Sequence, residues 1–458
     1  MKTYDLIVVG SGGGTKISTP AAKLGKKVAI IEKEDFGGTC LNRGCIPSKM
    51  FIHPANQLLQ AKNLGKYHIK HTGNFEVDFL NLARRITDEI THDSEGIEEM
   101  YETIESLDVY KGEARFVSEK VLEVRGEQIT APIIVLAVGS RPYVPPIPGL
   151  AGTPYMTSRE ALRPEKLPKK LLVIGGGYIA TELGHVYATL GSEAVFFVRD
   201  GYLTQEDETV SDAFQKEFEK HHMTHYGSTA LSVRYENDTF TIRATQPDGS
   251  VITETGDALF MATGVAPNTD NLGLENTPIA TYERGYIEVN EYLETKSPGV
   301  YAIGDCIGTY LFRHSVNFEG EYLFGQLFGD DDKSTIDYPP MPHAVFSHPE
   351  IAGVGLTEQA ARAAGIDYLA VTHTYKESAQ GMARIPEVGL VKLLFDRSSK
   401  QLIGAHIIGE EAATMIHQLI FAITMKATSD DLLKMIYIHP ALPEIVRNAA
   451  RKAAAELS

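Results

Sequence analysis

The strongest constraint on the fold is a strand, glycine-turn and helix pattern that occurs twice in the 458-residue sequence. The first copy leads from the apolar stretch 4–9 into the glycine-rich turn 10–14. The second copy leads from the apolar stretch 170–174 into three consecutive glycines at 175–177. A continuous apolar run before a glycine turn is typical of a parallel strand that is buried on both faces and followed by a helix. The sequence therefore predicts an α/β protein that contains two Rossmann-like units.

Both turns have the chemistry of a dinucleotide-binding site, since glycines let backbone N–H groups approach a pyrophosphate at a helix N-terminus. The candidate residues in the turns are Gly10, Gly12, Gly14, Gly175 and Gly177. In the first unit the next expected strand, 27–31, ends at Glu32, where a carboxylate can accept hydrogen bonds from ribose hydroxyls. In the second unit Arg199 stands at the equivalent place. A guanidinium there favours NADPH over NADH, although the adjacent Asp200 leaves both nucleotides open.

A second motif is the pair Cys40 and Cys45, in the run 37–49. A metal site would need further ligands of this type, and the only other cysteine is Cys306, which is expected to be an inert buried thiol. In a regular helix the Cα atoms of residues i and i+5 lie about 8–9 Å apart, whereas a disulfide needs about 4.4–6.8 Å. Gly44 is therefore expected to distort the chain between them. A strained bridge is easily reduced, so we interpret the pair as redox-active.

These motifs, in this order, resemble the class I flavoprotein disulfide reductases, the family of dihydrolipoamide dehydrogenase, glutathione reductase and mycothione reductase. The resemblance covers nearly the whole chain and also rests on the segments 262–268, 301–305, 344–358 and 439–444. It implies two nested Rossmann-like dinucleotide-binding domains plus a C-terminal α+β dimerisation domain. The predicted bounds are 1–150 and 261–335 for the two parts of the FAD-binding domain, 151–260 for the NAD(P)-binding domain, and 336–458 for the interface domain.

The resemblance also implies cofactors and site residues. FAD would bind the first turn, and NADPH or NADH the second. Further FAD-site residues would be Gly38, Thr39, Lys49, Gly139 and Asp305, and further nucleotide-site residues would be Tyr178, Glu182 and Gly264. Electrons would pass between the nicotinamide nucleotide, FAD, the Cys40–Cys45 disulfide and a small dithiol or disulfide substrate. Cys45 would be the thiolate that faces the flavin, and Cys40 would exchange with the substrate.

A candidate general acid/base lies near the C-terminus. An exchanging thiol needs a proton acceptor, and His439 suits that task because histidine is the side chain whose ordinary charge change lies nearest neutral pH. Glu444 can fix its tautomer. By resemblance, Lys49 pairs with Glu182 beside the flavin, and His439 serves the cysteines of the other subunit in a homodimer. The apolar stretch 415–423 reads as a helix that needs cover on more than one face, or one that is buried in its own subunit.

Composition restricts the partners. The 60 acidic and 43 basic residues give a net charge of −17, which argues against binding to nucleic acid or a membrane surface. The sequence has no apolar run of about eighteen residues, and its start enters a strand at once, so neither a membrane span nor a signal peptide is expected. Three cysteines without a disulfide framework predict a cytoplasmic protein. No metal site is predicted, and the aspartates at 330–332 are expected to form a solvated loop.

The substrate is the least constrained feature. The stretches 45–49 and 181–184 are similar to those of dihydrolipoamide dehydrogenase, whose substrate includes protein-bound lipoamide, and this type is placed first. The segments 311–319 and 439–444, with Arg199, are more similar to mycothione reductase. An NADPH-dependent reductase of low-molecular-weight disulfides, of the mycothione or glutathione type, is therefore the alternative. A non-catalytic flavoprotein redox sensor is an alternative of another class, and the complete set of candidate catalytic residues argues against it.

Overall fold

The computed structural model describes residues 1–329 and 334–458. The aspartate run 330–332, expected to be a solvated loop, lies outside the described residues. The chain forms two compact units, each assembled from three stretches. The first comprises Met1–Met50, Asn81–Tyr143 and Gly264–Asp337, and the second comprises Phe51–Leu80, Val144–Thr263 and Tyr338–Ser458. The domain bounds expected from the sequence stay a prediction.

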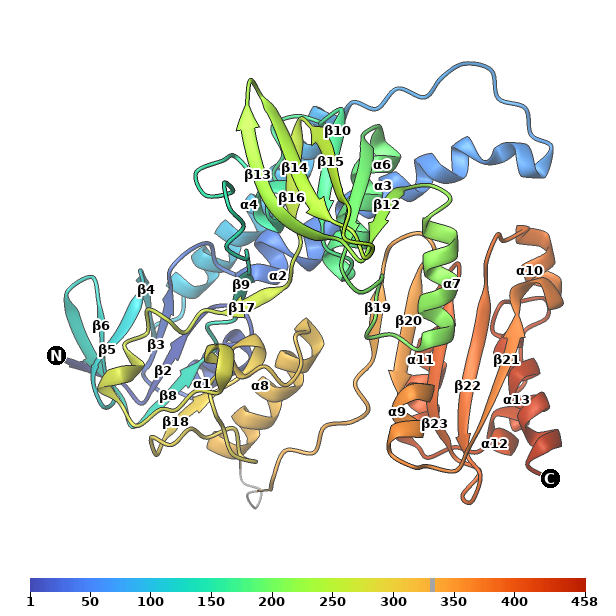
Figure 1. Ribbon diagram of the computed structural model, residues 1–458. Coiled ribbons are helices and arrows are strands. Elements are labelled where there is room, and N and C mark those ends of the chain that lie inside the picture. Colours follow the sequence, from blue (N-terminus) through green and yellow to red (C-terminus); the bar gives the residue numbers. More distant parts are fainter. Residues whose placement is uncertain (330–333) are drawn as a thin grey trace. The chain divides into compact units, whose positions relative to one another are not determined.

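The first unit is built on a five-stranded parallel sheet (Figure 1). Its strands, in spatial order, are β18 (Val300–Ala302), β8 (Ile133–Leu136), β2 (Leu6–Val9), β3 (Val28–Glu32) and β4 (Leu107–Lys111). Every residue of β2 and β3 is buried, as their continuous apolar runs predict for strands covered on both faces. Helices α1 (Thr15–Lys23) and α8 (Arg313–Phe328) pack against each other beside this sheet.

Smaller elements complete the first unit. A second sheet has the order β1 (Lys2–Thr3), β7 (Glu127–Thr130), β6 (Val121–Val124) and β5 (Ala114–Ser118). Strands β9 (Ser140–Pro142) and β17 (Val265–Pro267) form an antiparallel pair. The remaining helices that begin in this unit or end in it are α2 (Gly38–Arg43), α3 (Cys45–Lys62), α4 (Phe79–Glu102), η2 (Leu274–Asn276), η3 (Glu283–Gly285) and η4 (Gly304–Ile307).

The second unit contains the other parallel sheet, with the order β12 (Met223–Tyr226), β11 (Glu193–Val198), β10 (Lys170–Ile174) and β16 (Ala258–Met261). An antiparallel sheet of β13 (Thr229–Glu236), β14 (Thr239–Thr245) and β15 (Val251–Gly256) follows β12 in the sequence. Helices of this part are η1 (Leu64–Tyr67), α5 (Ser158–Ala161), α6 (Tyr178–Leu190) and α7 (Glu208–Phe218).

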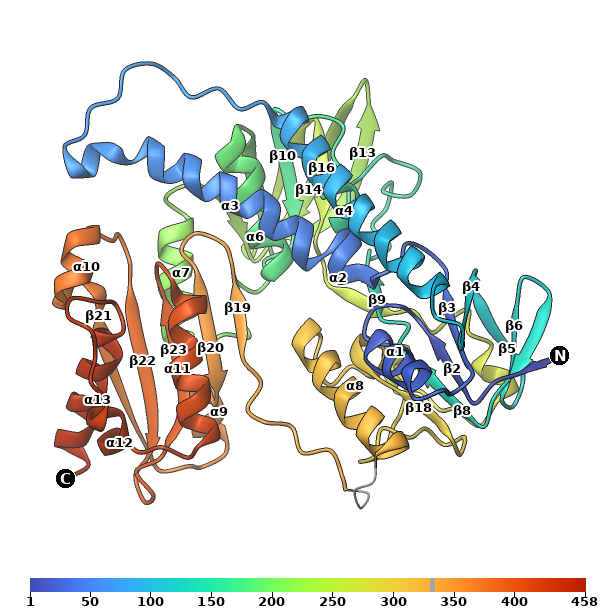
Figure 2. The ribbon, with the colours of Figure 1, turned by 180° about the vertical axis from the view of Figure 1, so that it is seen from behind.

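The C-terminal part of the second unit is an antiparallel sheet with helices on both faces. The strand order is β19 (His343–Val345), β20 (Ile351–Gly355), β23 (Leu402–Ile408), β22 (Leu390–Asp396) and β21 (Tyr368–Thr374). Helices α11 (Ala412–Thr424) and α13 (Glu444–Glu456) cover one face, and α7 lies against the other (Figures 1 and 2). The remaining short helices are α9 (Glu358–Ala363), η5 (Tyr375–Glu377), α10 (Ala379–Arg384) and α12 (Ser429–Lys434).

A buried ion pair fixes α7 to this sheet. Lys392 on β22 is 2 % exposed, and its Nζ lies 2.8 Å from a carboxylate oxygen of Asp207, the residue that caps α7. The same ammonium lies 2.8 Å from the hydroxyl of Thr209. A buried charge must be paired and hydrogen-bonded, and this arrangement meets that requirement. The start of α7 is therefore anchored to β22 of the C-terminal sheet.

Candidate active site

The first glycine turn depends on close backbone contacts. Gly10 has a φ of +106°, and a Cβ on it would lie 2.2 Å from the carbonyl oxygen of Ala137 on the neighbouring chain segment. Gly38 has a φ of +69°, and a Cβ there would lie 2.7 Å from the Cα of Gly12. Only glycine fits both positions. The start of α2, the helix that carries Cys40, therefore rests directly on the turn that follows β2.

Ser11 in this turn is hydrogen-bonded both to Glu32 and to Gly37, the residue that precedes α2. Glu32, at the end of β3, accepts hydrogen bonds from the backbone N–H of Ser11 at 2.9 Å and from its hydroxyl at 2.7 Å. The same hydroxyl accepts a hydrogen bond from the backbone N–H of Gly37 at 3.0 Å. Sequence reasoning identified Glu32 and missed Ser11, although its place inside the glycine turn was a usable signal. Hydrogen bonds thus link the glycine turn to the end of β3 and to the residue before α2.

The two cysteines lie on either side of a break between helices. Helix α2 ends at Arg43, α3 begins at Cys45, and Gly44 between them has φ −144° and ψ −115°, far from helical values. This is the distortion that the spacing of the cysteines led us to expect. Cys40 is partly buried, Cys45 is exposed, and both are free thiols here.

The two free thiols share a hydrogen bond that shifts their pKa values in opposite directions. The hydrogen bond from Cys45, together with the nearby charges of Arg313 and Lys49, lowers the pKa of Cys40 to about 7. The same bond raises the pKa of Cys45. The chain by itself therefore favours a thiolate on Cys40, whereas the resemblance assigns the flavin-facing thiolate to Cys45. Sequence reasoning missed Arg313, which begins α8 and lies close to both Gly12 and Cys40.

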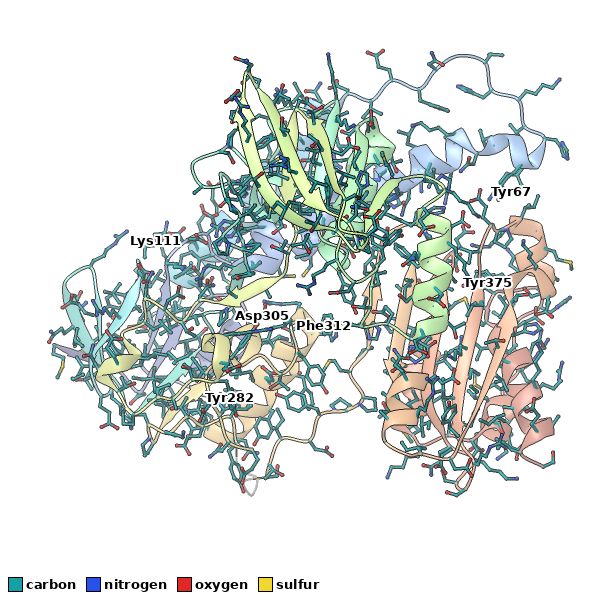
Figure 3. The ribbon with its side chains drawn as sticks, viewed as in Figure 1. Tyr67, Lys111, Tyr282, Asp305, Phe312 and Tyr375 are labelled. Carbon is teal, nitrogen blue, oxygen red and sulfur yellow. The ribbon has the colours of Figure 1, made fainter. Side chains whose placement is uncertain are left out.

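Asp305 lies in η4, directly after β18 (Figure 3). Burial raises the pKa of its carboxyl group, which accepts a hydrogen bond of 2.5 Å from the hydroxyl of Ser140. Ser140 follows Gly139, one of the expected FAD-site residues, so the two parts of that expected site meet in the structure. Cys306 is fully buried, and burial raises the pKa of its thiol to about 12, as expected of an unreactive cysteine.

The second glycine turn repeats the geometry of the first. Gly175 follows β10 with a φ of +136°, and a Cβ on it would lie 2.2 Å from the carbonyl oxygen of Ala262. Gly177 caps α6, and space is open where its Cβ would lie. Arg199 follows β11 and is exposed, with its Nε 2.7 Å from a carboxylate oxygen of Asp200. The expected nucleotide-site residues Gly175, Gly177 and Arg199 therefore lie together at the carboxyl ends of β10 and β11.

Two side chains of α6 are already held by hydrogen bonds. The hydroxyl of Tyr178 donates to the buried carboxylate of Glu206, which lies 2.8 Å from Nε2 of His343. Glu182 accepts a hydrogen bond of 2.9 Å from the backbone N–H of Phe346. Lys49 belongs to the first unit and Glu182 to the second, so their expected ion pair stays a prediction. Sequence reasoning missed Glu206 and His343.

His439 and Glu444 form a pair at the start of α13. Nδ1 of His439 lies 3.1 and 3.2 Å from the two carboxylate oxygens of Glu444. The imidazole is 72 % exposed and the carboxylate 5 % exposed. Burial by itself would raise the pKa of Glu444, but the backbone N–H of Ala441, His439 and Arg447 together lower it. The carboxylate is thus ionised at neutral pH and holds a proton on Nδ1, which leaves Nε2 free for proton transfer.

Comparison with known proteins decides the family. A family model described as pyridine nucleotide-disulphide oxidoreductase matches residues 4–320, and one described as the dimerisation domain of that family matches residues 341–450. The chain belongs to the pyridine nucleotide-disulphide oxidoreductases. It is therefore an enzyme, and both the family resemblance and the α/β fold class with a C-terminal dimerisation domain are confirmed.

Relatives in this family match along almost the whole chain. Mycothione reductase of Mycobacterium tuberculosis is 34 % identical over 469 residues, which cover 98 % of this chain and 99 % of the relative. Dihydrolipoyl dehydrogenase of Geobacillus stearothermophilus is 34 % identical over 455 residues, which cover 98 % and 96 %. The structure of the HOCl-induced flavoprotein disulfide reductase RclA from Escherichia coli superposes with a TM-score of 0.87 at 26 % identity and covers 98 % of this chain and 99 % of that chain.

Members of the pyridine nucleotide-disulphide oxidoreductases use FAD and a nicotinamide nucleotide. Both glycine turns fit such groups, because each presents backbone without a Cβ at the start of a helix that follows a parallel strand. The match to the dimerisation domain indicates a homodimer. Among the helices of residues 1–329 and 334–458, none has the length and apolarity needed to cross a membrane.

Proposed function

We propose that this chain moves electrons between a nicotinamide nucleotide and a small dithiol or disulfide through Cys40 and Cys45. The single observation that carries the proposal is the position of this pair, on either side of the break at Gly44 between α2 and α3, with the start of α2 resting on the first glycine turn. When bound in that turn, FAD supplies the two-electron chemistry that links a nicotinamide to a disulfide. The first turn with Glu32, Gly139 and Asp305 is the proposed FAD site.

Cys40 is the proposed exchanging thiol. Only a thiolate attacks a disulfide, and a thiol reacts best when its pKa lies near the ambient pH. The hydrogen bond from Cys45 and the charges of Arg313 and Lys49 bring Cys40 to about that value. Attack by its Sγ forms a mixed disulfide with one half of a disulfide substrate and releases the other half as a thiolate. Cys45 then displaces the first half, which reforms the Cys40–Cys45 bond and completes a two-electron reduction of the substrate.

His439 is the proposed group that moves protons during this exchange. The Glu444 carboxylate keeps a proton on Nδ1 of His439, so Nε2 can take a proton from a thiol and return it to a leaving thiolate. With 72 % of its side chain exposed, the imidazole is open to an approaching thiol. Glu444 is a positioning residue, because it acts through His439.

The imidazole would serve the cysteines of a second chain. Large apolar side chains of the C-terminal part face solvent, which supports a partner surface: Ile436 and Ile438, shortly before His439 in the sequence, are 99 % and 80 % exposed, and Phe421 on α11 is 68 % exposed. Within the chain, α11 covers the sheet with one face only. A twofold dimer that buries these side chains would also carry His439 into the interface.

NADPH is the proposed nucleotide, bound at the second turn. Arg199 uses Nε for Asp200, and no hydrogen bond from its Nη atoms to another residue of the described chain is found. A planar guanidinium with free N–H groups at the end of β11 can pair with a 2′-phosphate.

Oxidation of dihydrolipoamide is the first proposed reaction. Reduction of a low-molecular-weight disulfide, with electrons flowing in the opposite direction, is the second. The two relatives at 34 % identity carry these two activities in their names, dihydrolipoyl dehydrogenase and mycothione reductase. The deciding experiment is a steady-state panel of dihydrolipoamide with NAD⁺ and NADP⁺, and of lipoamide, oxidised glutathione and mycothiol disulfide with NADH and NADPH. Turnover of one pair with a kcat/KM far above the others identifies the substrate. A flavin-loaded protein that turns over none of them would contradict the proposed function.

A further inference from the structure

A cluster of three metal-ligating side chains lies outside the proposed active site. Glu217 is near the end of α7, His221 follows four residues later, and Glu387 lies in the loop between α10 and β22. One ligand atom from each residue lies within 4.8 Å of the others. All three residues belong to the second unit. The cluster therefore brings together side chains from the end of α7 and from the loop after α10, although Glu217 and Glu387 are 170 residues apart in the sequence.

The spacing of the ligand atoms is close to that of a metal site. Nε2 of His221 lies 3.6 Å from a carboxylate oxygen of Glu217 and 3.7 Å from one of Glu387. Ligands about 2.1 Å from a shared ion, at angles of about 110–120°, lie roughly 3.4–3.6 Å from one another. The two distances from His221 therefore already match those between ligands of one ion, and the two carboxylate oxygens lie within 4.8 Å of each other.

A buried carboxylate oxygen in the cluster lacks a hydrogen-bond donor. Glu217 is 3 % exposed, and its Oε1 has no hydrogen-bond partner among the described residues. The carboxyl group of Glu387 touches that of Glu217. An unsatisfied, buried carboxylate oxygen is costly, and two carboxylates in contact repel each other unless a proton or a cation lies between them. A positive charge at the point that His221 also faces would therefore stabilise the two carboxylates.

Among the described residues, these three side chains make up the cluster that could hold an ion. Lys220 bonds the other oxygen of Glu217 at 2.6 Å, so it orients this carboxylate and weakens the attraction for a cation. His222 follows His221, but its ring packs against Phe218 with centroids 4.2 Å apart, which uses this side chain in the core. His221 and Glu387 are about half exposed. Water can therefore fill the remaining positions around an ion.

The loop that carries Glu387 is held in place. The hydroxyl of Tyr67, in η1, donates a hydrogen bond of 2.8 Å to the carbonyl oxygen of Arg384, the last residue of α10 (Figure 3). The helix that leads to Glu217 is anchored at its start, ten residues earlier, by the Lys392–Asp207 ion pair. Both ligand-bearing segments are thus fixed by contacts that do not involve the ligands, which is the condition for a preorganised site.

We propose that Glu217, His221 and Glu387 bind a divalent first-row transition-metal cation. Two carboxylates and one imidazole suit Mn²⁺, Fe²⁺ or Zn²⁺, with water as the further ligands. The bound cation connects the end of α7 to the loop between α10 and β22. This inference does not depend on the proposed function, because none of its ligands belongs to the dinucleotide turns, the cysteine pair or the His439–Glu444 pair.

Mn²⁺ is the probe that tests this site, since thiolates such as those of Cys40 and Cys45 prefer softer metals. The flavin-loaded enzyme is freed of metal with a chelator and titrated with Mn²⁺, and the free ion is measured by electron paramagnetic resonance. We expect saturable binding of one Mn²⁺ per chain and a melting temperature that rises with Mn²⁺. Glu387→Gln and His221→Ala should each weaken binding by more than about tenfold.

Two further variants sharpen the test. Lys220→Met should bind Mn²⁺ several-fold more tightly, because it removes a positive charge from the cluster. Asp212→Asn, on the exposed side of α7, removes the same charge as Glu387→Gln and should bind like the wild type. Glu387 lies in an exposed loop, so its variant should fold, as its flavin spectrum will show. No saturable binding by the wild type, or binding that survives Glu387→Gln and His221→Ala unchanged, would overturn the proposal.

Discussion

Replacing Glu444 by glutamine tests whether this carboxylate sets the protonation of His439. The hydrogen-bond partners of the Glu444 carboxylate among the described residues all offer it a donor. The backbone N–H of Ala441 lies at 3.2 Å, an Nη of Arg447 at 2.8 Å, and Nδ1 of His439 at 3.1 Å. A glutamine keeps the shape but turns one acceptor into an NH₂ group, which must then face a donor. The tautomer of His439 is no longer fixed, and Nε2 is protonated in part of the molecules.

The size of the effect follows from the role of Nε2. A positioned general acid/base contributes about 10²–10⁴-fold to the rate, and losing the correct tautomer forfeits much of it. We expect kcat/KM for the thiol or disulfide substrate to fall about 10²–10³-fold, equivalent to about 3–4 kcal/mol of transition-state stabilisation. The lost charge-assisted hydrogen bonds should also cost about 1–3 kcal/mol of folding free energy.

The assay separates the two halves of the reaction. Steady-state kcat/KM reports the exchange step, and stopped-flow absorbance reports flavin reduction by NADPH. The rate of flavin reduction should stay within about threefold of the wild type, because the role proposed for His439 concerns only the thiols. Glu456→Gln is the matched control, since Glu456 is exposed on the same helix. A Glu444→Gln enzyme with a kcat/KM within about threefold of the wild type would refute the reasoning.

Three further predictions use other parts of the chain. Cys45→Ser should abolish the long-wavelength flavin absorbance of the two-electron-reduced enzyme, and Cys40→Ser should keep it. The opposite result would mean that the thiolate stays on Cys40, the cysteine whose pKa is lowered in the chain without cofactors. Arg199→Glu should raise the KM for NADPH far more than that for NADH, and equal changes would show that Arg199 does not read the 2′-phosphate. Burial raises the pKa of Glu350 to about 7, so its ionisation destabilises the fold as the pH rises from about 4.5 to 7. Glu350→Gln should therefore raise the free energy of unfolding in urea by about 1–3 kcal/mol at pH 8 and by little at about pH 4.5. A stabilisation that does not depend on pH would contradict this.

The parts of the fold that the sequence predicted well are those with a local physical cause. The strands β2, β3, β10 and β11 were expected because parallel strands buried on both faces need continuous apolar runs. The break at Gly44 was expected because a regular helix cannot bring residues five positions apart within disulfide distance. Such constraints act within a short window of sequence, so one chain is enough to infer them.

The residues that sequence reasoning missed depend on contacts between distant segments. Arg313 lies close to Cys40, about 270 residues earlier, only because α8 packs beside the first glycine turn. Glu206 joins Tyr178 to His343 across three segments. Arg447 is an exception, since its place one helical turn after Glu444 could have been recognised. The grouping of residues 51–80 with the second unit had no sequence signal that we can identify.

Cys40 and His439 are proposed to act together although they belong to different chains of a dimer. This proposal is tested by unfolding and refolding a Cys40→Ser chain and a His439→Ala chain together in equal amounts. Each heterodimer then has one intact site, so random pairing should restore about one quarter of the wild-type activity. Activity no higher than that of the separate variants, in a mixture shown to contain heterodimers, would contradict a site shared between two chains.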